Sequence, residues 1–128
     1  MSTTTKARRA DPLDLAGIDD LLSPEERSIR DSVRHHCETR IQPHIADWFE
    51  AGEIPDIRGV ARELGELGVL GMHLEGHGCA GLSAVDYGLA CLELEACDSG
   101  IRSLVSVQGS LAMFAIWRWG SDEQKATW

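Results

Sequence analysis

The residues best suited to chemistry are a lone arginine and the polar side chains spaced around it. Arg102 lies in the stretch Ser99–Gly120, which holds only one other charged residue. Burying an unpaired guanidinium costs several kcal/mol, so a carboxylate is expected beside it. The sequence therefore predicts that Arg102 meets either an acidic residue of this protein or the carboxylate of a ligand.

Polar residues on both sides of Arg102 recur at helical spacing. Glu95 precedes it by seven residues and Ser106 follows it by four, so the three would share one face of a continuous helix. Ser103 adds a second hydroxyl, and an arginine fork with two hydroxyls can hold a carboxylate. The alternative is an internal ion pair of Arg102 with Glu95 or Asp98, and the spacing leaves both interpretations open.

No other cluster matches an established catalytic or metal-binding pattern. A glycine-rich segment contains four groups able to bind metals, but their spacing fits no zinc motif: His73, Glu75, His77 and Cys79. No glutamate is followed by histidine three residues later, as a di-iron helical bundle requires, and phosphate-loop motifs are absent. We expect no metal site, and we attribute the glycines to close backbone approach.

The cysteines and the N-terminus indicate a reducing compartment. No C-x-x-C pair and no adjacent basic partner occur among the four cysteines, Cys37, Cys79, Cys91 and Cys97. The basic N-terminus lacks the apolar core of a secretory signal. We expect a cytoplasmic protein, or one of the mitochondrial matrix if the source is eukaryotic. His35 and His36 have charged neighbours, so both are expected to be exposed.

Chain length, net charge and the lengths of the apolar stretches limit the class of protein. A chain of 128 residues is long enough for one domain with a buried core. Its formal net charge of −9 argues against nucleic-acid binding, which needs clustered lysine and arginine. The longest apolar stretch, 104–117, is interrupted by polar residues and is shorter than the roughly 20 residues of a membrane span. No membrane span is expected.

Start and stop signals predict an all-α chain. Residues 1–22 are polar and are predicted to form a loose arm before the domain at 23–128. Ser23 and the proline after it predict the N-terminus of a long first helix. Pro43 is expected to kink or split that helix before Gly52 ends it.

Further helices follow the same logic. Residues 55–56 open a second helix that a glycine at 68 ends, and a glycine-rich loop without regular structure is expected over 72–82. Ser83 begins a helix that is apolar nearly all round and is expected to be enclosed by others. Asp98 is predicted to cap the next helix, 101–119, and Ser121 to begin the last.

Four sequence runs resemble the acyl-CoA dehydrogenases, and within them the glutaryl-CoA dehydrogenase branch. They are LGELGVLG at 64–71, GHGCAG at 76–81, DSGIRS at 98–103 followed by SVQ, and GSDEQK at 120–125. The resemblance implies the N-terminal helical-bundle domain of a three-domain fold, in a chain that ends before the middle β domain. It also implies FAD, a glutamate that removes the α-proton of an acyl thioester, and a flavin that accepts a hydride from the β-carbon.

In the glutaryl branch the resemblance implies decarboxylation as well, giving crotonyl-CoA and carbon dioxide. Arg102 and Ser103 would contact the distal carboxylate of the glutaryl group, with Ser106 and Glu95 lining that end of the pocket. No catalytic or flavin-binding residue falls within this chain, which alone is expected to be inactive and not to bind FAD. The implied partners are acyl-CoA, an electron acceptor and further copies in a tetramer. Alternatives are a different acyl specificity, or a non-catalytic helical interaction module.

Overall fold

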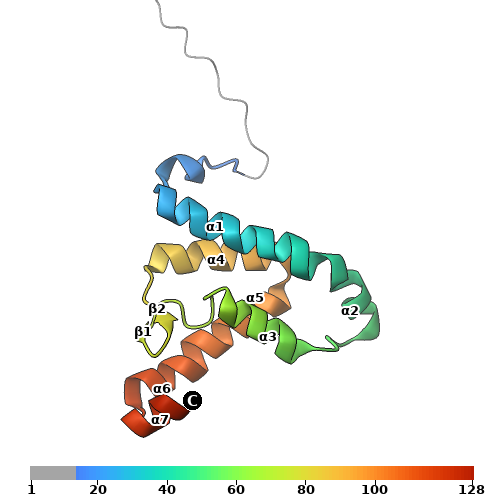
Figure 1. Cartoon of the computed structure of the whole chain (residues 1–128). Coiled ribbons are helices and arrows are strands. Elements are labelled where there is room, and N and C mark those ends of the chain that lie inside the picture. The colour runs from blue at the N-terminus through green and yellow to red at the C-terminus, as the bar shows by residue number, and fades with distance from the viewer. Residues whose placement is uncertain (1–13) are drawn as a thin grey trace, which may run out of the picture.

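A computed structural model describes residues 14–128, and it is almost entirely helical (Figure 1). A short 3-10 helix, η1 (Ile18–Leu21), precedes α1 (Pro24–His36). The backbone N–H of Glu26 donates to the Ser23 hydroxyl, and the Glu26 carboxylate accepts from the Ser23 backbone N–H. This reciprocal cap confirms the predicted helix start. Residues 1–13 of the predicted arm lie outside the described residues.

The first helix does not continue straight through Pro43. After α1 the backbone forms a π-helical turn, η2 (Cys37–Ile41), and a 3-10 turn, η3 (Gln42–His44), before α2 (Ile45–Ala51). Proline has no N–H to donate and clashes with the preceding turn, so the regular hydrogen-bond ladder is lost around it. Gly52, with φ of 71°, ends α2. The predicted split and stop are both confirmed.

The middle of the chain contains α3 (Ile57–Glu66) and a glycine-rich loop. Within the loop, β1 (Glu75–Gly76) pairs antiparallel with β2 (Cys79–Ala80). The expectation of no regular structure over 72–82 is therefore wrong for this small hairpin. His77 and Gly78 have positive φ at its tip, a conformation that favours a tight two-residue turn.

In the second half, two helices meet at a sharp bend, called the corner below, and the helical segments over 99–119 then continue in one direction as an interrupted helix, called the rod below. α4 (Ala84–Cys97) meets α5 (Ser99–Val107) at Asp98, and a π-helical segment, η4 (Gln108–Met113), separates α5 from α6 (Phe114–Trp119). The capping signals at Ser83 and Asp98 are confirmed. The single helix predicted over 101–119 is instead broken by η4. The final helix is α7 (Asp122–Thr127), capped by Ser121 as predicted.

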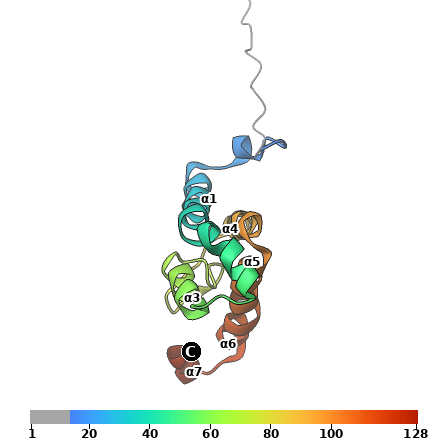
Figure 2. The same cartoon turned by 90° about the vertical axis from the view of Figure 1, so that its right-hand side faces the viewer.

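The core lies between α1 and α4, with α3 and α5 below them (Figure 2). Buried side chains of all four helices and the π-helical turn contribute to it, among them Val33, Cys37, Ile41, Leu64, Leu94, Ile101 and Val105. The carboxylate of Glu93 on α4, with a side chain only 5% exposed, accepts hydrogen bonds of 2.8 Å from Nε and Nη2 of Arg34 on α1. This pair joins the two central helices.

Two glycines bring the loop against the rod. A Cβ on Gly109 would lie 2.9 Å from the backbone nitrogen of Gly71, and a Cβ on Gly71 would lie 2.6 Å from Cε of Met113. Neither position can carry a side chain without moving its neighbour. The predicted close backbone approach is confirmed at Gly71, although the glycines of the hairpin tip only supply positive φ.

Several apolar side chains of the second half face outward. Within the described residues, Val85 and Leu92 of α4 are exposed, so this helix is not enclosed on all sides as expected. Leu111, Trp119 and Trp128 are also exposed, where α6 and α7 extend away from the α1–α4 pair (Figure 1). Among residues 14–128, no helix combines the length and the apolar character needed to cross a membrane.

Candidate functional site

The corner between α4 and α5 positions Arg102. Asp98 adopts an extended backbone conformation, and its carboxylate accepts the backbone N–H of Ile101 at 2.9 Å. Its carbonyl accepts the backbone N–H of Arg102 at 3.1 Å. Because Asp98 is used as a helix cap, it is not the ion-pair partner of Arg102. That alternative from the sequence is removed.

Glu95 is the ionic partner of Arg102 in this structure. Nε of Arg102 donates to the Glu95 carboxylate at 2.5 Å, and the Ser99 hydroxyl donates to its other oxygen at 2.6 Å. The bond from Ser99 and then the guanidinium hold the pKa of Glu95 below its usual range. The carboxylate correspondingly raises the pKa of Arg102. Glu95 is thus an ionised partner that leaves part of the guanidinium unused.

The serines complete the cluster. Nη1 of Arg102 donates to the Ser106 hydroxyl at 3.3 Å, and that hydroxyl donates to the Ser103 carbonyl at 3.2 Å. Within residues 14–128, neither Nη2 of Arg102 nor the Ser103 hydroxyl has a hydrogen-bond partner. The four residues singled out from the sequence therefore lie together, and two of their donors are unpaired among the described residues.

The exposure of this cluster differs from the expectation. The side chain of Arg102 is 35% exposed and that of Glu95 is 48% exposed, so the predicted burial of the guanidinium is wrong for the described residues. The apolar neighbours Ile101 and Val105 point into the core, whereas Arg102 lies on the outer side of α5. An ion pair this open is weakly held and can exchange partners.

A tyrosine beside this cluster was not singled out from the sequence. The Tyr87 hydroxyl on α4 lies 3.2 Å from the Ser110 hydroxyl in η4. Partial burial raises the pKa of the Tyr87 phenol and Cys91 raises it further, while the bond to Ser110 and the charge of Arg102 lower it. The sequence does contain a signal for Tyr87, because Tyr87, Cys91 and Glu95 are spaced four residues apart and so lie along one face of a helix.

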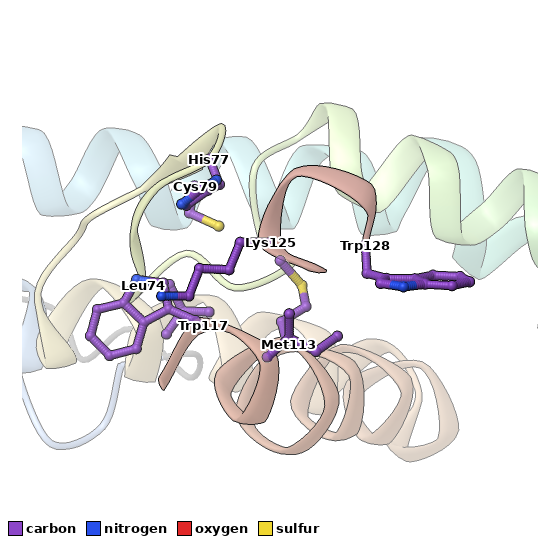
Figure 3. A pocket seen from close by; sticks show the side chains of 8 residues that line it. Leu74, His77, Cys79, Met113, Trp117, Lys125 and Trp128 are labelled. Carbon is purple, nitrogen blue, oxygen red and sulfur yellow. The ribbon is translucent and has the colours of Figure 1, made fainter. Parts of the chain in front are cut away.

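A small, partly open pocket lies elsewhere, among the hairpin, η4, α6 and α7 (Figure 3). Its volume is about 70 Å³, and its lining includes Leu74, Cys79, Met113, Trp117 and Trp128. Small-molecule sites usually occupy ~300 Å³ or more. This pocket is therefore small for a substrate.

The four metal-capable groups of the loop do not come together. Among residues 14–128, no group of three or more histidine, cysteine, aspartate or glutamate side chains is arranged to hold a metal ion. Cys79 is partly buried, which raises the pKa of its thiol, and no disulfide links the four cysteines.

Comparison with known proteins places this helical arrangement in a family. The model of the acyl-CoA dehydrogenase N-terminal domain matches residues 23–128. The chain belongs to the acyl-CoA dehydrogenase family. Two crystal structures of glutaryl-CoA dehydrogenase from Mycobacterium smegmatis superpose with a TM-score of 0.87 over 94% of this chain, at 68% and 56% identity. The second is a complex with FADH2.

Curated acyl-CoA dehydrogenases are more distant relatives. A probable acyl-CoA dehydrogenase, YngJ, of Bacillus subtilis is 31% identical over 83% of this chain. The (2S)-methylsuccinyl-CoA dehydrogenase of Cereibacter sphaeroides is 32% identical over 84% of it. The chain spans 31% of the length of the two mycobacterial structures, 28% of the Bacillus protein and 19% of the Cereibacter protein. The acyl-CoA dehydrogenase N-terminal fold predicted from sequence is confirmed.

Proposed function

We propose that this chain is the N-terminal part of an FAD-dependent glutaryl-CoA dehydrogenase and supplies the end of the acyl site that holds the distal carboxylate. The similarity to glutaryl-CoA dehydrogenase, at 68% identity, supports the branch. The observation that carries the proposal is the half-open Arg102 cluster, in which Nη2 and the Ser103 hydroxyl are without partners in residues 14–128.

The chemistry of the cluster suits a dicarboxylic acyl group. A carboxylate arriving beside α5 would accept from Nη2 of Arg102 and from the Ser103 hydroxyl, while Glu95 continues to accept from Nε. Hydrogen bonds to charged groups are about twice as strong as neutral ones. An acyl chain that ends in a methyl group would leave these donors unpaired, so the cluster discriminates against it. Ser106 would keep Nη1 aligned during the exchange.

We assign the flavin and the base that removes the α-proton to other parts of the complete enzyme, because this chain spans 31% of the glutaryl-CoA dehydrogenase structure that is a complex with FADH2. When bound there, the flavin would accept a hydride from the β-carbon. The part assigned to this chain is to bind and orient the acyl end.

The remaining assignments follow from the same proposal. The complete enzyme would oxidatively decarboxylate glutaryl-CoA to crotonyl-CoA and pass electrons to a separate acceptor. We propose a homotetramer in the cytoplasm, or in the mitochondrial matrix of a eukaryote, in keeping with four cysteines that form no disulfide. A related specificity, for another short dicarboxylic acyl group, is supported by the similarity to a (2S)-methylsuccinyl-CoA dehydrogenase.

The decisive experiment changes Arg102 in the full-length flavoenzyme that carries this domain. Arg102→Gln should lower kcat/KM for glutaryl-CoA by about 10-fold or more, because it removes donors to a charged group. Turnover of butyryl-CoA, which has no distal carboxylate, should not fall. Arg118→Gln is the matched control, since Arg118 is exposed and its guanidinium lies over the ring of Trp119. Equal effects of Arg102→Gln on both substrates would refute the assignment, and (2S)-methylsuccinyl-CoA as a third substrate tests the related specificity.

A further inference from the structure

A polar contact that the proposed carboxylate site does not use joins α4 to η4, about two helical turns after Arg102. The phenol of Tyr87 reaches from α4 to the Ser110 hydroxyl in η4, with 3.2 Å between the oxygens. The tyrosine ring also packs against the ring of His73 in a tilted arrangement, with 5.0 Å between ring centroids. Tyr87 is thus held between the glycine-rich loop and the π-helical segment.

The position of Ser110 depends on the π-helical segment. Arg102, Ser106 and Ser110 are spaced four residues apart, and in a regular α-helix each such step overshoots a full turn by about 40°. Over two steps Ser110 would rotate about 80° away from Arg102. The wider turn of η4 offsets part of this drift and keeps Ser110 on the side that faces α4. A π-helical turn is less favourable than an α-helical one, so a tertiary contact is needed to hold it.

The environment of Tyr87 keeps its phenol able to act as that contact. Partial burial raises its pKa, and neighbouring Cys91 adds to the rise, while the bond to Ser110 and the charge of Arg102 act in the opposite direction. The phenol is therefore neutral at physiological pH and retains its proton. It can donate to Ser110 or accept from it, which gives the contact a choice of two arrangements.

We propose that Tyr87 is a positioning residue of the acyl site: through Ser110 it fixes the turn that follows Ser106, and so fixes the distance between the donors of Arg102 and the rest of the acyl chain. This inference rests on the proposed function. Tyr87 need not touch the substrate. Tyr87 affects how well a short dicarboxylic acyl group spans the site between its thioester end and the donors of Arg102. Binding of a short monocarboxylic group does not use those donors and so does not depend on Tyr87.

The test in the full-length flavoenzyme uses Tyr87→Phe, Ser110→Ala and the double variant. A neutral hydrogen bond corresponds to about 3- to 10-fold in affinity. Tyr87→Phe should raise KM for glutaryl-CoA by that factor, with kcat and butyryl-CoA turnover unchanged. Ser110→Ala should do the same, and the double variant should be no worse than either single one, because all three lose one contact. Equal losses for both substrates, or additive losses, would show a general structural role and overturn the proposal.

Arg102→Gln in the same experiment separates the two hypotheses. If it acts selectively on glutaryl-CoA while Tyr87→Phe does not, the proposed function stands and the role of Tyr87 is rejected. If Arg102→Gln has no selective effect, both are rejected.

The 128-residue chain allows an independent measurement because it contains a single tyrosine. Spectrophotometric titration of the native chain should give a phenol pKa above its ordinary value of about 10. Ser110→Ala removes a bond that lowers this pKa, so the titration should move to still higher pH. Ser103→Ala, about two helical turns before Ser110, is the matched control and should leave the titration unchanged. A titration unaffected by Ser110→Ala would contradict the contact itself.

Discussion

Two glutamates of α4 each pair with an arginine of another helix, but one carboxylate is buried and the other is exposed. At the α1–α4 interface, Arg34 uses Nε and Nη2 together on Glu93, whose side chain is 5% exposed. At the α4–α5 corner, Arg102 uses only Nε on Glu95, whose side chain is 48% exposed. The first carboxylate is enclosed by packing. The second keeps one side in contact with solvent.

The difference separates a structural ion pair from one suited to a ligand. The doubly hydrogen-bonded pair at the α1–α4 interface cannot lose its arginine without leaving the buried carboxylate of Glu93 unpaired, so it is fixed as long as the domain is folded. An open pair with an unused donor can take a second anion at little cost. We infer that the α1–α4 half provides the rigid frame and that the corner provides the adjustable contact.

The strongest test of the rigid frame is a pair of leucines on α4. Leu94 is fully buried, whereas Leu92 is 49% exposed. Leu94→Ala should lower the free energy of unfolding by about 2 to 5 kcal/mol, because it leaves a cavity in the core. Leu92→Ala should cost less than about 1 kcal/mol. Urea unfolding followed by circular dichroism measures both, and similar losses would mean that α4 has no distinct buried side.

The two ion pairs themselves give the next largest effect. Arg34→Gln should lower the free energy of unfolding by about 2 to 3 kcal/mol, somewhat below the usual cost of breaking a buried pair because Arg34 is itself one-third exposed. Arg102→Gln should leave the unfolding midpoint nearly unchanged, since its pair is open to solvent. If Arg102→Gln destabilised the chain as much as Arg34→Gln, the corner would be part of the frame.

The smallest expected effect is a pH dependence of the free energy of unfolding, tested at two adjacent histidines. His36 is only 15% exposed, its Nε2 lacks a hydrogen-bond partner, and burial lowers its pKa despite Glu63 at 4.0 Å. The unfolded chain therefore takes up the proton first, so stability is full above about pH 6.5 and falls as pH drops below it. His36→Gln should flatten unfolding curves compared between pH 7.5 and 5.5, whereas His35→Gln, at an exposed position, should not.

The carboxylate that faces His36 does not change its charge within that pH window. Arg40 lowers the pKa of Glu63, so this carboxylate remains ionised throughout it. A slope that persists in His36→Gln would mean that another group is responsible for the acid sensitivity.

Local signals in the sequence predicted most helix boundaries. Ser23, Ser83 and Ser121 are confirmed as caps because a capping box depends only on residues three apart, and Pro43 disrupts its own helix wherever it is placed. The grouping of Arg102 with Glu95 was also predictable, since a single helix corner separates them.

Features that depend on distant contacts were not predictable in the same way. His36 was expected to be exposed, but packing near Glu63 on α3 covers it. The π-helical segment at 108–113 and the contact of Tyr87 with Ser110 depend on how α4 meets the rod, 23 residues apart along the chain. The openness of Arg102 likewise depends on which surfaces cover α5, and composition does not show this.

The contact between Gly71 and Gly109 has a mechanical consequence. Because the two backbones touch without intervening side chains, there is no soft layer to absorb a displacement of one against the other. A shift of the glycine-rich loop would be passed directly to the turn beside Ser110. The glycine-rich loop and the turn that carries Ser110 would therefore move together.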